Sequence, residues 1–364
     1  MTSTRTVTKL TSYHNRRKLS QIGPTSTLSH SHGMRLSPSI FISIGLLALT
    51  SSASASAGDR LSEFRNCVDN CVATVCNSRS PPRLPIYLTA FFWDCTQNCD
   101  YRCQRSITSQ RIDDDKPVLQ FHGKWPFQRL LGIQEPASVL FSMLNFVPHY
   151  LAFHDLRKLL PPDDARANFF LRKYYLLVTI TGMNAWVWSS VFHCRDFVLT
   201  ERLDYFSAGL TILSGFYFAV VRNFRLDRLE MEKARVVFTI VCCLALCSHI
   251  FYLSFIKFSY SYNMMANVVI GICQNLLWVY YSICNYFFPT DVYSKQRELW
   301  TLWPLWNVIL LTFAMSLELF DFPPWMDAID AHSLWHAATI VPSFWWYKWM
   351  TKDAAREAVV KQKD

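Results

Sequence analysis

Apolar segments of near-spanning length make up most of the chain from Pro136 onward, and short polar loops separate them. A membrane-spanning helix needs about 20 mostly apolar residues, which is close to the length of each segment. The sequence therefore predicts an all-α fold, a seven-helix transmembrane bundle. Its helices are expected near residues 136–155, 168–191, 204–221, 234–256, 263–287, 299–320 and 331–349.

The composition agrees with a membrane protein. Hydrophobic residues make up 51% of the chain and charged residues only 17%, whereas an ordinary soluble domain has about 25% charged residues. A formal charge of +9 would suit a nucleic-acid partner if it were gathered in one patch. The basic residues instead lie mainly in the short loops, so we attribute the charge to membrane topology and expect no nucleic-acid partner.

The loops on one side of the predicted membrane are much richer in Lys and Arg than those on the other. Basic residues gather near 157–173, 222–235 and 295–297, and again beyond residue 348. Because cytosolic loops carry the excess of positive charge, these loops and the C-terminus are predicted to be cytosolic and the N-terminal region luminal. The opposite loops contain only Arg195, Arg202 and Lys257.

The N-terminal part of the chain has the pattern of a targeting sequence. Residues 34–57 contain one Arg, an apolar core at 40–49 and small residues in an Ala-x-Ala pattern, which is typical of a secretory signal peptide. Residues 1–33 are rich in Ser and Thr, show no apolar period and are predicted to be a disordered extension. The predicted organisation continues with a Cys-rich luminal domain at 58–135, the seven-helix domain at 136–350 and a cytosolic tail at 351–364.

Half of the 12 cysteines fall within the predicted luminal domain. A secretory signal implies an oxidising compartment, so three disulfides are expected, and spacings of four residues place two pairs of sulfurs on helix faces. Six cysteines allow 15 pairings, among which the sequence does not choose. A zinc site is the alternative, although the region has no Cys-x-x-Cys pair. The disulfide candidates are Cys67, Cys71, Cys76, Cys95, Cys99 and Cys103.

Polar residues from three separate segments are predicted to meet near the luminal surface. Ser189 and His193 lie four residues apart at the end of the second apolar segment, and Asp204 begins the third. His332 and His336 open the seventh segment from the same side. The topology prediction did not use these residues, so their common depth is independent evidence for a site.

These side chains suit metal-assisted hydrolysis of an acyl bond. Three imidazoles are typical ligands of Zn²⁺ and leave a position open for water. Asp204 is able to take a proton or to orient a ligand. Ser189 is able to donate a hydrogen bond to the oxyanion that develops as the carbonyl is attacked. A site rooted in the bilayer would meet lipid substrates.

Simpler interpretations remain for each of these residues. His332 and His336 are also typical of two polar side chains at a membrane interface. Ser190 is almost as well placed as Ser189. Three other carboxylates compete with that of Asp204, and any of them would also suit a solvated loop; they are Asp196, Asp327 and Asp330.

The ordered pattern of Ser189, His193, Asp204, His332 and His336 resembles the CREST superfamily of membrane hydrolases, which includes the alkaline ceramidases. Longer stretches resemble the post-GPI-attachment-to-proteins factor three family. These stretches are "FHGKWPFQRLLGIQEPASVLFS", "SSVFHCRDFVLTERLDYFSA" and "DAHSLWHAATI".

This resemblance implies a GPI-specific phospholipase A2, which removes the sn-2 fatty acid from the GPI anchors of proteins. It implies a metal, inferred to be zinc, on His193, His332 and His336, with Ser189 and Asp204 as the accompanying catalytic pair. It also implies residence in the endoplasmic reticulum membrane, or alternatively in the Golgi. Two other functions stay open: a ceramidase-like amide hydrolase, against which the Cys-rich domain argues, and a non-catalytic chaperone or receptor for GPI-anchored cargo.

Overall fold

The structure is a computed structural model that describes residues 56–80, 83–160, 171–289 and 297–360. The predicted N-terminal extension and nearly all of the predicted signal peptide lie outside the described residues. Within the described part, the secondary structure is helical, and the β contacts there are isolated bridges such as Phe121 with Lys124. The all-α prediction is confirmed for this part of the chain.

The N-terminal region is a small helical unit stapled by disulfides. Helix α2 (Ser62–Cys71) runs on through a π turn (Val72–Cys76), and the short α3 (Ile86–Ala90) precedes α4 (Cys95–Asp113). Helix α4 begins at a capping box, in which Asp94 accepts from the Gln97 backbone N–H at 2.7 Å and Gln97 accepts from the Asp94 N–H at 3.1 Å. The two interactions satisfy backbone donors that would otherwise be unpaired at the helix start.

The six candidate cysteines form three disulfides, as predicted. The pairs are Cys67 with Cys103, Cys71 with Cys99, and Cys76 with Cys95. The pairing is nested: the first cysteine of the α2 segment bonds to the last of α4, which is the order that two antiparallel helices require. Because all six sulfurs are in disulfides, they are not available for the alternative zinc site.

A helix lies at each of the seven positions predicted to cross the membrane. Four of the helices have one end at the candidate site, on the predicted luminal side. They are α5 (Pro136–Leu159), α6 (Arg172–Cys194), α7 (Val198–Asn223) and α11 (Ala331–Val360). The others are α8 (Glu232–Phe251), which continues as a π segment (Tyr252–Ile256), α9 (Tyr260–Phe287), and α10 (Trp303–Glu318), which follows a 3-10 turn (Leu299–Leu302). Residues 351–360, predicted as a tail, continue α11 as helix.

Four of these helical segments are long and apolar enough to cross a membrane, among the residues described: Val198–Asn223, Leu229–Ile256, Tyr260–Phe287 and Leu299–Glu318. Helices α5, α6 and α11 are not among the four. They carry most of the buried polar side chains of the bundle, including Ser142, Asn145, Ser189 and His336. That all seven helices cross the membrane stays a prediction.

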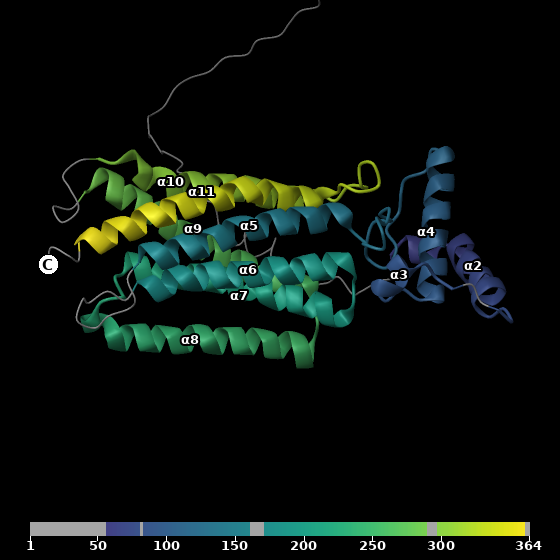
Figure 1. Cartoon of the computed structure of the whole chain (residues 1–364), viewed down its shortest axis with the longest axis horizontal. Coiled ribbons are helices and arrows are strands. Elements are labelled where there is room, and N and C mark those ends of the chain that lie inside the picture. Colours follow the sequence, from purple (N-terminus) through teal and green to yellow (C-terminus); the bar gives the residue numbers. More distant parts are fainter. Residues whose placement is uncertain (1–55, 81–82, 161–170, 290–296, 361–364) are drawn as a thin grey trace, which may run out of the picture. The chain divides into compact units, whose positions relative to one another are not determined.

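The helices pack in an order that brings α5, α6 and α11 together. Helix α5 packs against α6 and α11, α10 packs against α11, and α7 packs against both α6 and α9 (Figure 1). Helix α8 lies at the edge beside α7, and its Val237, Ile240 and Leu244 side chains are exposed, as expected of a surface that faces lipid.

Buried charges connect four of the helices at the end of the bundle where α11 finishes. The Asp353 carboxylate of α11 accepts hydrogen bonds from Arg222 of α7 at 2.7 and 2.8 Å, from Tyr175 of α6 at 2.5 Å and from Tyr281 of α9 at 2.7 Å. Glu357 pairs with Arg222 as well, at 2.7 Å. Such a network is stable only when every buried charge has its partner.

Candidate metal centre

Three histidines from two helices converge at the opposite end of the bundle. His193 ends α6, and His332 and His336 lie one turn apart at the start of α11, so both face the same side of that helix. One ring nitrogen of each lies within 4.8 Å of the others, and the Nε2 atoms of His193 and His332 are 3.3 Å apart. The structure thus brings together the three predicted metal ligands.

The other ring nitrogen of each histidine has a fixed partner. Nδ1 of His193 lies 2.7 Å from Glu135 Oε2, and Nδ1 of His332 lies 2.9 Å from Glu318 Oε2. A carboxylate accepts only, so each Nδ1 carries a proton, and the other nitrogen, Nε2, has a lone pair whenever the ring is neutral. In the neutral form of both rings, the two Nε2 lone pairs face each other at 3.3 Å, and a cation between them would stabilise that arrangement.

His336 is held by α5. Its Nδ1 lies 3.0 Å from Ser142 Oγ, which leaves Nε2 for a ligand as in the other two rings. The His336 carbonyl accepts from Asn145 Nδ2 at 2.7 Å, and Asn145 Oδ1 accepts from the Thr339 hydroxyl at 3.2 Å. These bonds fix the first turns of α11 against α5, and with them the position of the His336 ring.

Glu135 is the most strongly held of the supporting carboxylates. It lies just before Pro136, whose fixed φ suits the first position of α5, and its backbone N–H donates to the His193 carbonyl at 3.0 Å. Lys124 forms an ion pair with its side chain at 2.6 Å. Burial opposes ionisation of Glu135, but the charge of Lys124 and the hydrogen bond from His193 hold its pKa well below its ordinary range, so the carboxylate is ionised at neutral pH.

The predicted catalytic pair lies at the same place. Ser189 is buried, and its Oγ lies 3.0 Å from Ser142 Oγ, which in turn contacts His336. Asp204 is partly buried near the start of α7 and has no hydrogen bond or ion pair with any other described residue. Its carboxylate is therefore available to a ligand or a proton.

A cavity of about 330 Å³ adjoins these groups inside the bundle. Ser189, Asp204, His332 and His336 line it at the histidine end. Most of its wall is apolar and aromatic, a lining typical of a pocket for an apolar ligand; this part includes Ile212, Phe218, Trp278, Leu311 and Trp346.

The competing carboxylates have other partners. Asp196 pairs with Lys124 at 2.9 Å, and Asp327 pairs with Arg105 at 2.5 Å. Asp330 caps α11, since its Oδ1 accepts from the Ser333 backbone N–H at 2.9 Å. Of the four aspartates considered, Asp204 alone lines the cavity with the histidines.

Three supporting residues were not singled out from the sequence: Glu135, Glu318 and Ser142. Each contacts a different histidine through Nδ1. The available signal was weak: Glu135 precedes the first apolar segment and Glu318 ends the sixth, so both lie at the predicted luminal edge. His149 of α5 is also buried, accepts a hydrogen bond from Trp186 at 3.1 Å and lines the cavity.

Comparison with known proteins places the chain in a family. Residues 85–354 match the Per1-like family model. The chain is 42% identical over 316 residues to the "Protein PER1 homolog" of Schizosaccharomyces pombe, covering 86% of this chain and 92% of the relative. It is 42% identical to "Protein PER1" of Saccharomyces cerevisiae over 288 residues, which cover 74% of this chain and 80% of the relative.

The resemblance noted in the sequence is also confirmed. The human protein named "GPI-specific phospholipase A2-like PGAP3" is 35% identical over 309 residues, which cover 83% of this chain and 90% of the relative. No solved structure matches the chain. The matched region contains all three histidines, Ser189 and Asp204, and this chain belongs to the Per1-like family.

Proposed function

We propose that this chain is a metal-dependent hydrolase that removes the sn-2 fatty acid from the GPI anchors of proteins, a GPI-specific phospholipase A2. The observation that carries the proposal is the set of three imidazoles that each offer a ring nitrogen within 4.8 Å of the others, beside a mostly apolar cavity. The names of relatives at 35% identity support the lipid class and the type of bond.

His193, His332 and His336 would hold the metal, for which zinc is the best match to three imidazole ligands. When bound, a zinc ion supplies Lewis acidity toward a water molecule and an ester carbonyl. The residues fit such an ion because Glu135, Glu318 and Ser142 fix each ring with Nε2 directed to the common centre.

The remaining roles follow from the positions of the side chains. The apolar wall of the cavity would hold the acyl chain, so that the ester lies at the histidine end. Asp204, whose carboxylate has no other partner, would accept the proton of the attacking water and return it to the leaving alcohol. Ser189 would donate to the carbonyl oxygen as negative charge develops, while Ser142 holds its Oγ in place.

The site is proposed to lie at the luminal face of the endoplasmic reticulum membrane, or alternatively of the Golgi. In this topology all seven helices cross the membrane, the disulfide region is luminal and the C-terminus is cytosolic. The disulfides support an oxidising compartment for the N-terminal region. The basic loops support a cytosolic side for the far end of the bundle.

The test compares His336→Ala with His154→Ala, which removes an exposed histidine of α5. Metal content of the purified proteins and loss of the sn-2 chain from GPI anchors, followed by mass spectrometry, are measured together. We expect His336→Ala to lose both and His154→Ala to keep both. A folded, metal-free His336→Ala protein with normal turnover would refute the metal dependence. Absence of turnover by the parent protein would favour the chaperone or receptor function, and release of fatty acid from ceramide instead would favour the amide hydrolase.

A further inference from the structure

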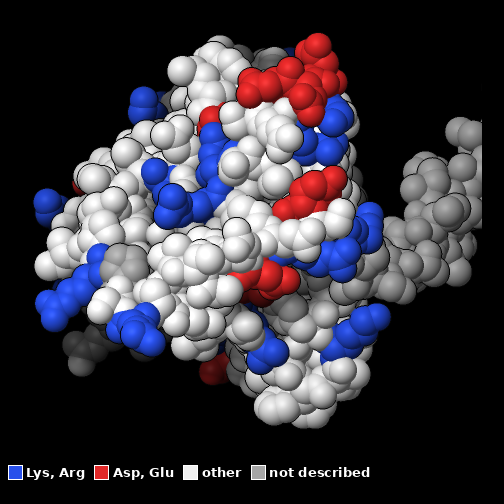
Figure 2. Space-filling view, turned by 90° about the vertical axis from the view of Figure 1, so that its right-hand side faces the viewer, with Lys and Arg blue, Asp and Glu red and all other residues white. Residues whose placement is uncertain are grey.

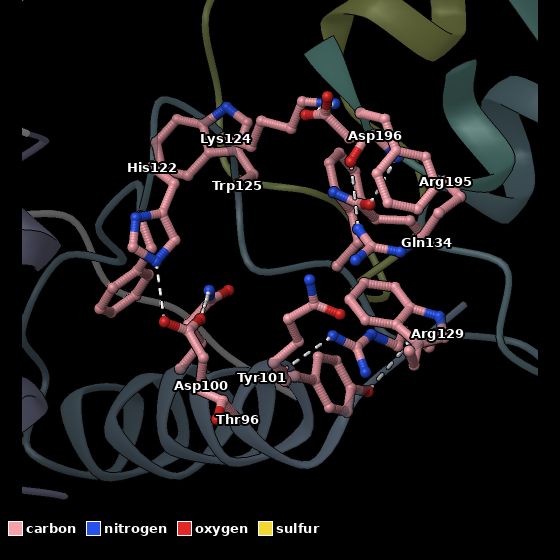
Figure 3. Close-up of a pocket in the computed structure, with 16 residues that line it drawn as sticks. Thr96, Asp100, Tyr101, His122, Lys124, Trp125, Arg129, Gln134, Arg195 and Asp196 are labelled. Atoms are coloured by element: carbon pink, nitrogen blue, oxygen red, sulfur yellow. Dashed lines mark hydrogen bonds and ion pairs between the residues drawn. The ribbon is translucent and has the colours of Figure 1, made fainter. Parts of the chain in front are cut away.

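A second cavity, of about 420 Å³, lies between α4, the segment at 121–134 and the connection from α6 to α7. Figure 3 shows its labelled side chains around an open centre, with His122 on the side opposite Arg129 and Gln134 and with Lys124 extending toward Asp196. The wall of the bundle cavity is mostly apolar, whereas the wall of this cavity is rich in amide and charged side chains. The end of the molecule that carries it displays basic and acidic side chains interleaved (Figure 2).

Two arginines of this cavity are held by aromatic rings. The guanidinium carbon of Arg129 lies 3.2 Å from the ring centre of Trp93, and that of Arg195 lies 3.5 Å from the same ring. Tyr101 contacts Arg129 in the same way at 3.8 Å, and Trp93 is fixed by a hydrogen bond from its Nε1 to the Gly132 carbonyl at 2.7 Å. Stacking orders both guanidinium planes without neutralising their charge.

The charges around the cavity are unevenly paired. Lys124 has both Glu135 and Asp196 as partners, and His122 pairs with Asp100 at 2.9 Å. Arg129 and Arg195 form no ion pair with any described residue, although Arg195 is nine-tenths buried.

The polar contacts of the two arginines are correspondingly weak. Arg129 Nη2 reaches the Gln97 carbonyl only at 3.5 Å, and its Nη1 is buried with no hydrogen-bond partner among the described residues. Arg195 Nη1 donates to the Asp196 carbonyl at 3.2 Å. Burial lowers the pKa of Arg129 to about 9, because the nearby carboxylate of Asp100 offsets only part of the cost of burying the charge. A bound anion would offset that cost.

We propose that this cavity binds the phosphorylated sugar headgroup of the lipid substrate, with the phosphate on Arg129 and Arg195 and ring hydroxyls on the neighbouring amides. Guanidinium groups suit phosphate because their N–H donors match its oxygens in pairs. The cavity is far larger than one phosphate, and the side chains of Gln97, Gln104 and Gln134 offer both donors and acceptors to hydroxyl groups. The identity of the lipid rests on the proposed function.

The headgroup cavity is connected to the metal centre through contacts already described. Lys124 lines this cavity and bonds to Glu135, which bonds to His193. Arg195 follows His193 by two residues at the end of α6. A headgroup on the arginines and an acyl chain in the bundle cavity would therefore place the ester between them, near the three histidines.

The test uses the full-length protein in detergent micelles and myo-inositol 1-phosphate as the probe, with binding measured by titration calorimetry. Saturable binding is expected, and Arg129→Gln should weaken it by about 10- to 100-fold because a charge-assisted hydrogen bond is lost. Arg129→Lys, which keeps the charge but not the planar fork, should also weaken binding. Arg102→Gln, at an exposed position of the same helix as Tyr101, is the matched control and should bind as the parent does.

Three competitors decide the chemistry and the source of the ligand. We expect myo-inositol and inorganic phosphate each to bind more weakly than the phosphorylated sugar, and micellar GPI lipid to compete with the probe. Equal affinity for inorganic phosphate would overturn the sugar part of the proposal, and failure of the intact lipid to compete would overturn its assignment as a lipid headgroup site. Unchanged binding by Arg129→Gln would overturn the arginine site itself.

His336→Ala separates this proposal from the proposed function. Because His336 does not line the headgroup cavity, this variant should lose hydrolysis and retain binding of the probe. Binding of the probe without any hydrolysis by the parent would leave the headgroup site standing and the hydrolase proposal refuted. Hydrolysis of GPI lipid with no binding of the probe, and with the same KM for parent and Arg129→Gln, would refute the headgroup site alone.

Discussion

Replacing Glu135 by Gln is the sharpest test of how the protein prepares its histidines for a metal. The substitution keeps the shape of the side chain but removes the charge that faces His193 Nδ1 at 2.7 Å. Lys124 keeps a partner, because Asp196 lies 2.9 Å from its Nζ. The change is therefore confined largely to the support of one imidazole.

The expected loss follows from the depth of that contact. His193 is only 2% exposed and Glu135 5%, so little water is available to replace the lost interaction. Removing a group that orients a ligand typically weakens metal binding by about 10- to 100-fold, or about 1.4–2.8 kcal/mol. Glu318→Gln should lie at the lower end of this range, because its bond to His332 is longer, at 2.9 Å, and the His332 side chain is 33% exposed.

The assay is a competition titration of each purified variant against a chelator of known zinc affinity. Activity is then followed as zinc is added back. Both variants should regain most of their turnover at excess zinc, since the three ligands themselves are intact. Glu63→Gln, at an exposed position of α2, is the control for removal of a carboxylate and should match the parent.

Unchanged zinc affinity in Glu135→Gln would show that the carboxylate does not prepare His193 for a metal. A loss of turnover that excess zinc does not restore would also refute the reasoning, because it would make Glu135 a direct participant in the chemistry. Thermal unfolding of the metal-free proteins separates either result from a loss of folding.

Three further predictions concern stability. Asp353→Ala should destabilise the detergent-solubilised protein by about 3–5 kcal/mol, since it leaves buried hydrogen-bond donors and a guanidinium without their shared carboxylate. Thermal unfolding measures this loss of stability, and a loss below about 1 kcal/mol would contradict the prediction. Gly182→Ala should cost about 1–3 kcal/mol, because the new Cβ would overlap the His149 ring and displace it from the cavity wall; an unchanged unfolding temperature would refute this packing. The hydrogen bond to Asp100 raises the pKa of His122 above its ordinary 6.5, so its stabilisation is fully present below pH 6.5 and is lost as pH rises through the raised value. His122→Gln should abolish that pH dependence, whose size should stay below about 1 kcal/mol because the side chain is 58% exposed.

The helices were predictable from the sequence because their signal is local. A segment of about 20 apolar residues has few alternatives to a helix in a membrane, and a helix lies at each expected position. The boundaries were less well predicted: α6 begins at Arg172 and not near 168, and α11 runs on to Val360. The last turns of α11 are polar, so the apolar stretch of the sequence ends before the helix does. Asp353 and Glu357 are accommodated in these turns because both form buried ion pairs.

Pairings between distant residues were not predictable in the same way. The number of disulfides followed from the cysteine count, but the nested connectivity depends on α2 and α4 being antiparallel, which no local pattern shows. The histidines were found because His332 and His336 share a helical spacing and His193 lies at the same predicted depth. Their partners Glu135 and Glu318 have no such periodicity, since a carboxylate at a helix end is common for other reasons.

The arrangement of the two cavities argues for a substrate that is polar at one end and apolar at the other. The bundle cavity is mostly apolar and ends at His332, His336 and Asp204, whereas the headgroup cavity presents two unpaired guanidinium groups. His193 lies between the two cavities. Its imidazole faces His332, which lines the bundle cavity, and its Nδ1 contacts Glu135, which pairs with Lys124 of the headgroup cavity. A soluble ester would use only one of these surfaces. A lipid ester uses both, and its scissile bond lies where apolar chain and polar headgroup meet, which is where the structure gathers its three imidazoles.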